Sequence, residues 1–211
     1  SGVNIIGYKI LSGTGELIQE IVAVNLNQAN EVIIEGYSSI GSNAFNGATT
    51  VTSIVIPSTV TSIGYQAFFS AKNLTVVNIP SSVASIGIMA FYNTALTSIT
   101  IPEGVTSIES ATFQQMYSLT SISIPASVTS IGLGVFNWST SLANITVSSS
   151  NTHYKTIDGV LFDSSGATLI QYNLGYGRLS YAVPTSVTTI VSPAFMAASH
   201  LTSITIPASV K

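Results

Sequence analysis

The chain of 211 residues contains no cysteine, so it has no disulfide framework, no thiolate nucleophile and no cysteine-ligated zinc site. Charge is almost as scarce: Asp, Glu, Lys and Arg make up 6% of the residues, against a usual share of roughly 25%. Only five Lys and Arg are present, which excludes a basic surface for nucleic acid. No apolar run approaches the roughly 18 residues that a membrane-spanning helix needs.

What the chain does contain is apolar and hydroxyl side chains. Apolar residues make up 46% of the sequence and the net charge is only −3, the opposite of the composition of a disordered chain. Ser and Thr number 33 and 24, so hydroxyl groups supply much of the polar surface. The length suits one large domain or two small ones. We therefore expect a soluble, nearly uncharged protein with a sizeable core.

One phrase repeats along the chain. VTSIVIPSTVTSIGYQAF begins at Val51 and returns with small changes at Leu74, Leu96 and Leu119. A fifth copy opens at Leu142 as LANITV, and the cadence resumes only at VPTSVTTIVSPAF before the final LTSITIPASVK. The prolines and closing phenylalanines recur every 22 or 23 residues: Pro57, Pro80, Pro102 and Pro125; Phe45, Phe68, Phe91, Phe113 and Phe136. A period of this size is typical of solenoids.

Each unit predicts a short strand followed by a second extended piece. In the second copy, Val77 and Ile79 alternate with outward residues, and Pro80 ends the strand because it cannot donate to a ladder. The second piece ends at Ile86, and the remainder is long enough only for a brief helical turn. One unit cannot bury its own apolar edge, but stacked units can, through parallel strands about 4.8 Å apart. Six such coils are expected.

The phrase LTSITIPxSVTSIGxxAF resembles the BspA-type leucine-rich repeat, and the stretch from Tyr154 to Tyr172 is similar to the hairpin that such proteins place between repeats. The resemblance covers the chain from about Val32 to its last residue. It implies a leucine-rich repeat solenoid with 22–23 residues per coil, short parallel β-strands, brief helical turns and loops, and a β-hairpin insert in one repeat. It also implies a surface-exposed or secreted protein that acts in adhesion or protein binding and has no catalytic residues.

Residues 1–31 do not match the repeat and are expected to cap the solenoid. A Ser-Gly-Thr-Gly sequence at 12–15, between two apolar stretches, predicts a hairpin, and solenoids need a polar cap to shield the open core. We therefore divide the chain into a capping hairpin at 1–31 and a solenoid at 32–211. The C-terminal end carries no such cap, so its strand at 201–206 predicts self-association or dependence on further chain.

The segment at about 148–183 interrupts the cadence and is the one chemically mixed region. Asp158-Gly159 predicts a type I′ turn and residues 164–167 a second turn, which together give a small meander. Tyrosines of this insert form either a contact patch for a partner or the hairpin's own core. They are Tyr154, Tyr172, Tyr176 and Tyr181.

Residues that alternate with the core in each first strand are expected to face outward in two columns. These columns are the candidate binding face: Ser53, Val76, Ser98, Ser121, Asn144 and Ser203 in one, and Val55, Asn78, Thr100, Ser123, Thr146 and Thr205 in the other. The second extended pieces give a similar far face around Thr61, Thr106 and Thr129. These faces either bind extended partners, as solenoids do, or merely tolerate tight strand stacking.

Nothing in the sequence predicts an enzyme. No GxSxG elbow precedes a helix, and His153, Asp158 and one of the many serines would make a triad only by coincidence. His200 lies in a turn, and Glu103 and Glu109 are isolated. No catalytic residue, metal site or cofactor is therefore expected.

Together with what the resemblance implies, these observations favour a non-enzymatic binding module at the cell surface or secreted. Its partner would be a protein or an extracellular-matrix ligand, bound without nucleic acid or a membrane span. Two alternatives remain open. Regular hydroxyl columns could bind ice or a crystal surface, which a thermal-hysteresis measurement would reveal, or the solenoid could be a passive spacer in a larger surface protein.

Overall fold

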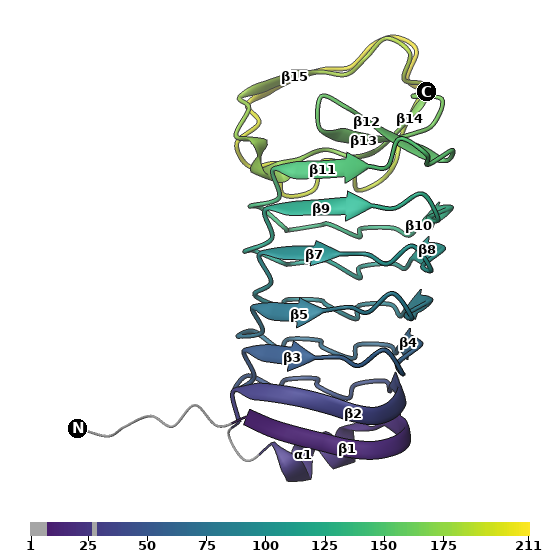
Figure 1. Ribbon diagram of the computed structural model, residues 1–211. Helices are drawn as coiled ribbons and strands as arrows, with labels where there is room; N and C mark the ends of the chain where they lie inside the picture. Colours follow the sequence, from purple (N-terminus) through teal and green to yellow (C-terminus); the bar gives the residue numbers. More distant parts are fainter. Residues whose placement is uncertain (1–7, 27–28) are drawn as a thin grey trace, which may run out of the picture.

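The computed structural model describes residues 8–26 and 29–211, and these form a stack of coils that rises from β1 to the C-terminal coils (Figure 1). The first strands of the coils are β1 (Tyr8–Leu17), β2 (Glu31–Ile40), β3 (Ser53–Val55), β5 (Val76–Asn78), β7 (Ser98–Thr100), β9 (Ser121–Ile124), β11 (Asn144–Val147), β15 (Ser180–Ala182) and β17 (Ser203–Thr205). The second strands are β4 (Ser62–Ile63), β6 (Ser85–Ile86), β8 (Ser107–Ile108), β10 (Ser130–Ile131), β14 (Thr168–Gln171) and β16 (Thr189–Ile190). The remaining elements are α1 (Gln19–Asn25), β12 (Tyr154–Ile157), β13 (Val160–Asp163) and the 3₁₀ turn η1 (Leu174–Tyr176).

Strands of neighbouring coils pair in parallel, one coil apart. Ile54 lies opposite Val77 in the first strands, and Ile63 lies opposite Ile86 in the second strands. The predicted solenoid of short parallel strands is therefore confirmed. Nine first strands stack within the described residues, against the six coils expected, because β1, β2 and β15 take the strand position without the full motif.

A ladder of phenylalanine rings runs through the core. The rings of Phe45, Phe68, Phe91, Phe113 and Phe136 are at most 1% exposed and stack at centroid distances of 5.4, 5.0, 6.0 and 6.0 Å. The inward Ile, Val and Leu side chains of the coils surround this stack in one continuous cluster. The 22- or 23-residue spacing of the phenylalanines thus places one ring in each coil directly against the ring of the next.

The segments that close the coils are turns without helix, rather than the brief helical turns expected. The five closing segments before the insert each contain two residues with left-handed φ four positions apart, such as 56° at Met89 and 55° at Asn93. Alternate N–H groups of these turns donate to carbonyl groups of the next coil. Four coils make twelve such hydrogen bonds, from Asn43, Phe45, Gly47, Gln66, Phe68, Ser70, Met89, Phe91, Asn93, Ala111, Phe113 and Gln115.

Hydroxyl side chains also tie each coil to the one before it. Thr75 and Thr120, directly before first strands, donate to carbonyl oxygens 23 residues earlier. The residue two positions after the proline of a unit also donates its hydroxyl to a carbonyl oxygen of the preceding coil. At this position Thr59, Ser82, Ser127 and Ser209 reach carbonyl oxygens at 2.6–2.7 Å. Many of the abundant hydroxyl groups therefore satisfy backbone acceptors within the fold.

Gly104 is the exception at this position, and Gly104→Ser is expected to raise the free energy of unfolding by about 1 kcal/mol. The serine would donate to the carbonyl oxygen of Val83, which lies 3.2 Å from the position of a Cβ on Gly104. Its Cβ would also reduce the freedom of the unfolded chain. Urea denaturation measures the change, and Gly104→Ala supplies the matched control without a hydroxyl. Equal stability of the serine and alanine variants would show that the serine hydroxyl makes no such hydrogen bond.

The predicted N-terminal hairpin is wrong. β1 continues through the Ser-Gly-Thr-Gly sequence and pairs in parallel with β2, and α1 follows β1. The glycines serve close strand approach: a Cβ on Gly13 would collide with the ring of Tyr37, and one on Gly36 with the carbonyl of Gly13. α1 buries Val22 in the same cluster as Phe45. A capping role for residues 1–31 stays a proposal, and residues 1–7 and 27–28 of that range lie outside the described residues.

The insert forms the predicted meander, because β12 pairs antiparallel with β13 and β13 with β14. Its C-terminal bound is wrong, since the repeat has resumed by Ser180, where β15 pairs in parallel with β17. β14 also returns to the solenoid, as it pairs in parallel with β16. The repeat was not recognised at this strand because it has Tyr181 and Ala182 where the regular copy has Ile204 and Thr205.

β13 joins two hydrophobic clusters. Leu161 packs into the cluster that contains the phenylalanine ladder, whereas Val160 and Phe162 pack into a second cluster with Leu169 and Tyr172. All five side chains are at most 3% exposed. The insert is therefore part of the core and connects the N-terminal coils to the C-terminal coils.

At the C-terminal end, β17 pairs with β15 and with no other strand among the described residues. Ile204 and Ile206 are 38% and 53% exposed there. The predicted self-association through this end stays a prediction.

Candidate functional site

The outward residues of the first strands form the two columns that the sequence predicts, and all are at least partly exposed. We call the outward side of β1, β2, β3, β5, β7, β9 and β11 the main face. Between β3 and β5, Ser53 lies in register with Val76, and Val55 with Asn78. Across β7, β9 and β11, Ser98 lies in register with Ser121 and Asn144, and Thr100 with Ser123 and Thr146. Ser203 and Thr205 pair with Ser180 and Ala182 beyond the insert, in a separate two-stranded ladder.

Most hydroxyl groups of the main face are unused inside the protein. The hydroxyl of Thr146 donates to the carbonyl oxygen of Ile122, whereas those of Ser98, Thr100 and Ser123 have no partner within the described part of the chain. These groups can both donate and accept, so they can meet amide, hydroxyl or carbonyl groups of a partner.

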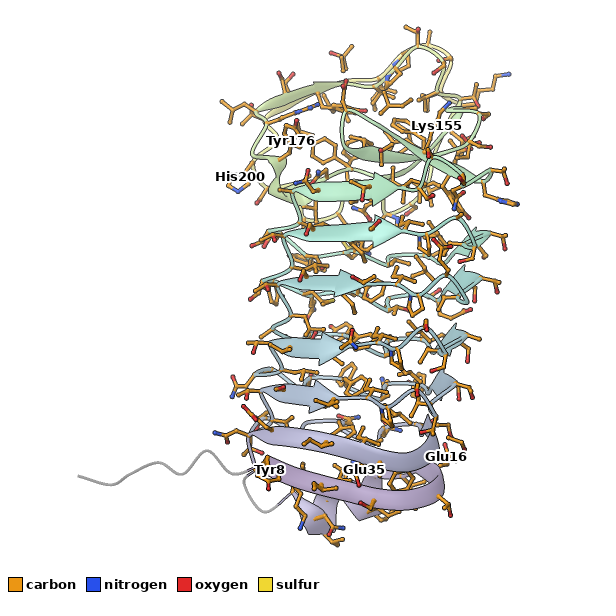
Figure 2. All side chains as sticks on the ribbon, in the orientation of Figure 1. Tyr8, Glu16, Glu35, Lys155, Tyr176 and His200 are labelled. Atoms are coloured by element: carbon orange, nitrogen blue, oxygen red, sulfur yellow. The ribbon has the colours of Figure 1, made fainter. Side chains whose placement is uncertain are left out.

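The middle of the main face also lacks charge. Between Gly36 and Thr152 the charged residues are Lys72, Glu103 and Glu109, and none of them lies in a strand. Charged side chains gather instead at the two ends of the stack, with Glu16 and Glu35 at one end and Lys155 at the other (Figure 2). A partner on the main face would therefore be recognised by shape and hydrogen bonds rather than by a charge field.

At its N-terminal end the main face carries exposed apolar side chains beside Glu31 and Glu35. Ile10 lies opposite Ile33, and Ile33 lies opposite Val55. Ile10, Val55, Val76 and Tyr8 are 43%, 52%, 58% and 66% exposed. The residues of β1 were missed as part of this face because a hairpin was expected there, and those of β2 because it lacks the full repeat motif.

The far face uses its hydroxyl groups differently. The hydroxyl of Thr61 donates to the carbonyl oxygen of Ser38 in the preceding coil, and that of Thr129 to the carbonyl oxygen of Thr106, both at 3.3 Å. The second strands between β4 and β10 are only two residues long. The far face is therefore built largely to hold the coils together, and the main face is the better candidate for binding.

The four tyrosines of the insert do not form one surface. Tyr172 and Tyr181 are 3% and 7% exposed and pack against Phe195, with ring centroids 5.2 and 6.2 Å apart. Burial raises the pKa of Tyr181 to about 12. Tyr154 is half-buried, and only Tyr176 is clearly exposed. Of the two interpretations, the core therefore holds for Tyr172 and Tyr181. A contact role for Tyr154 and Tyr176 stays a prediction.

No arrangement for metal-assisted chemistry is visible in residues 8–26 and 29–211, where no three His, Asp or Glu side chains gather as metal ligands. Burial raises the pKa of Asp163, but hydrogen bonds from the N–H groups of Thr168 and Gly166 and from the Ser165 hydroxyl lower it on balance. Asp163 therefore organises the turn after β13 as a carboxylate. None of the helices in the described residues is both long and apolar enough to cross a membrane.

Comparison with known families gives a match over most of the chain. The model of the BspA type leucine rich repeat region matches residues 38–167 and 178–211, in six copies. The unmatched residues between these ranges contain β14 and η1, which follow the β12–β13 hairpin. No protein of curated function matches the chain.

Solved structures share the architecture. A leucine-rich repeat protein from Eubacterium ventriosum matches with a TM-score of 0.83 and 27% identity, over 96% of this chain and 56% of that one. The pneumococcal vaccine antigen PcpA matches with a TM-score of 0.76 and 22% identity, over 87% and 52%. A leucine rich cell surface protein from Faecalibacterium prausnitzii matches with a TM-score of 0.50 and 24% identity, over 88% and 72%. The chain thus has the leucine-rich repeat fold and spans about half the length of the first two proteins.

Proposed function

The chain belongs to the BspA-type leucine-rich repeat family, and we propose that it is a non-enzymatic binding module in adhesion or protein–protein interaction. Solenoids of this kind present extended surfaces to their partners. The observation that carries the proposal is the middle of the main face, from β3 to β11, where the sheet is uncharged and the serine and threonine hydroxyls are mostly unpartnered within the described chain. Its partner is a protein or an extracellular-matrix ligand.

We place this module at the cell surface or in a secreted protein. One similar structure is a vaccine antigen and another is a cell surface protein, which supports this location. At 22% and 24% identity these likenesses establish the fold alone, so the location belongs to the proposal.

The alternative of an ice- or crystal-binding surface has less support. Val55, Val76, Asn78 and Asn144 interrupt the hydroxyl columns, so the main face does not repeat one chemical group at a fixed spacing. A passive spacer would show no saturable binding at the main face, and the experiment below tests that possibility.

Substitution of three outward-facing residues of the main face, Ser98, Thr100 and Ser121, by Glu is expected to weaken partner binding by at least about 10-fold. The three carboxylates would add bulk and unpaired charge to a contact surface that has neither. The fold should persist, because these side chains point away from the core. Surface plasmon resonance against a panel of purified extracellular-matrix proteins measures the loss, and thermal unfolding checks the fold.

The matched control carries Glu at Ala84, Thr106 and Ser130, three exposed residues of the far face in the same region of the stack. It should bind like the unmodified chain. Loss of binding in this control, with binding kept in the main-face variant, would show that the far face is the binding surface and contradict the proposal.

A further inference from the structure

The insert interrupts the hydrogen bonding between coils at one place. In four successive coils, three alternate N–H groups of the closing turn donate to carbonyl groups of the next coil. In the coil before the insert the equivalent groups belong to Gly134, Phe136 and Trp138. None of these three N–H groups has a hydrogen-bond partner in the part of the chain that the structure describes. Phe136 is buried, Gly134 is partly exposed and Trp138 is exposed. Backbone N–H groups in such positions are usually paired, so these groups are free to bind a ligand.

The interruption arises because the next coil has moved away. Tyr172 takes the ring position of that coil, since its N–H donates to the carbonyl of Ala194 as the N–H groups of the phenylalanines do in earlier coils. The ladder of phenylalanine rings nevertheless ends at Phe136, and Tyr172 stacks on Phe195 with ring centroids 5.2 Å apart. β13 has entered between the two coils and holds them apart with Leu161.

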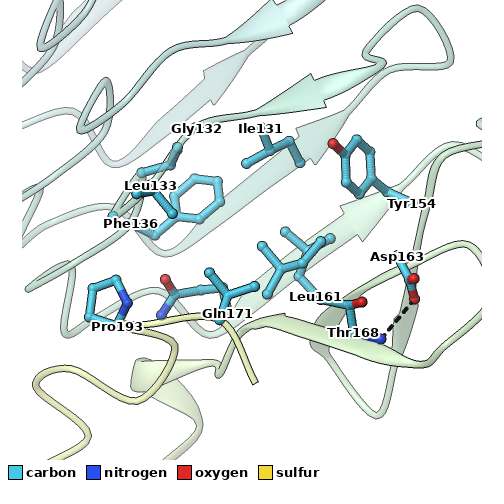
Figure 3. A pocket seen from close by; sticks show the side chains of 14 residues that line it. Ile131, Gly132, Leu133, Phe136, Tyr154, Leu161, Asp163, Thr168, Gln171 and Pro193 are labelled. Carbon is cyan, nitrogen blue, oxygen red and sulfur yellow. Dashed lines mark hydrogen bonds between the residues drawn. The ribbon is translucent and has the colours of Figure 1, made fainter. Parts of the chain in front are cut away.

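A cleft of about 310 Å³ lies at this interruption. Figure 3 shows Ile131, Leu133 and Phe136 along one side of it, with Leu161 and Gln171 on the opposite side. Phe136 and Leu161 are buried, whereas Leu133 is 62% exposed. The buried residues therefore form the floor, and Leu133 marks the mouth of the cleft.

The chemistry of the lining selects a neutral ligand. The lining residues include no Lys, Arg or His. The carboxylate of Asp163 accepts hydrogen bonds from the N–H groups of Gly166 and Thr168 at 2.8 and 3.1 Å and from the Ser165 hydroxyl at 2.9 Å. An anion would therefore meet a carboxylate and no cation. A hydrocarbon chain would leave the N–H groups of Gly134 and Phe136 unpaired.

We propose that this cleft binds a short, extended, apolar peptide segment of a partner protein. In the other coils, the groups that satisfy these N–H positions are peptide carbonyls of alternate residues, such as Tyr65 and Ala67. An extended peptide also presents the carbonyls of alternate residues along one edge, and it can pair with a backbone edge whose N–H groups are free. Its apolar side chains pack against Ile131 and Leu133. The volume accommodates roughly two or three residues.

The test is titration of the ¹⁵N-labelled chain with the blocked peptide acetyl-Leu-Ala-Leu-methylamide, followed by amide chemical shifts. Saturable downfield shifts are expected at the amide protons of Gly134 and Phe136. Leu133→Asp should weaken the affinity by about 10-fold or more, because it removes an apolar contact at the mouth. This change should not affect folding, since Leu133 is largely exposed.

The matched control is Ile88→Asp, at the equivalent exposed position of an intact coil, which should leave the affinity unchanged. The main-face variant at Ser98, Thr100 and Ser121 should also bind the peptide normally, so failure at either surface can be told from failure at the other. Shifts that are absent at Gly134 and Phe136, with rapid solvent exchange of both amides, would mean that the cleft holds only water. Equal binding by Leu133→Asp would likewise overturn the proposal.

Discussion

Phe91→Ala is expected to lower the free energy of unfolding by about 3–5 kcal/mol. The Phe91 ring is fully buried and stacks between Phe68 at 5.0 Å and Phe113 at 6.0 Å. Its removal takes away the transfer energy of the ring, both aromatic contacts and the packing of two coil interfaces. A regular backbone ladder on each side prevents the neighbouring coils from collapsing into the space. Urea denaturation followed by circular dichroism measures the loss.

Phe69→Ala is the matched control, because Phe69 follows Phe68 in the closing turn, is only partly buried and stacks on Tyr92 at 4.6 Å. It should cost only about 1–2 kcal/mol, in proportion to its smaller burial. Similar losses for Phe69→Ala and Phe91→Ala would show that the ring ladder is not the centre of the core.

Phe162→Ala is expected to destabilise the C-terminal coils by about 3–5 kcal/mol while the N-terminal coils keep their stability. Phe162 is fully buried in the second cluster, which is separate from the ladder of phenylalanine rings. Each coil contacts only its neighbours, so the loss should stay local. Hydrogen exchange of individual amides measures this distribution. Protection at Tyr172 and Val191 should fall by about 100-fold or more, and protection at Phe45 and Phe68 should not change.

Phe91→Ala gives the reciprocal control in the same experiment, with protection lost at Phe68 and kept at Val191. A uniform loss of protection along the whole chain in Phe162→Ala would contradict the division into two clusters. It would show that the stack unfolds as a single cooperative unit.

The repeated coils could be predicted from the sequence because each copy contains the residues that determine its own strand, turn and core position. Pro80 ends a strand, Phe91 enters the core, and the 23-residue spacing places equal residues in register, so errors in one copy are corrected by the others. The outward columns follow from the same alternation. For this reason the main face was found residue by residue, from Ser53 to Thr146.

The unique segments could not be predicted in the same way. Gly13 and Gly15 are typical of a turn, but in the structure Gly13 allows the Tyr37 ring of the parallel neighbour to approach. Tyr181 resembled a contact residue, although it is buried and lies in register with Ile204 in the middle of the neighbouring first strand. In both cases the residue type indicated one environment, and contacts with a distant strand determined another.

The cleft beside Phe136 had no sequence signal at all. It depends on a hydrogen bond that is not made, since the same N–H position in Phe113 is paired with Val135. The cleft exists because β13 displaces a whole coil, and this displacement is visible only in the structure.

Hydroxyl-radical footprinting of the free and partner-bound chain tests the central claim, that the main face is the binding surface. Val55 and Val76 are exposed on that face, whereas Ile88 and Trp138 are exposed in the closing turns. With a bound partner, oxidation of Val55 and Val76 should fall several-fold, and oxidation of Ile88 and Trp138 should not change. Protection of Ile88 and Trp138, with Val55 and Val76 still oxidised at the free rate, would contradict the account.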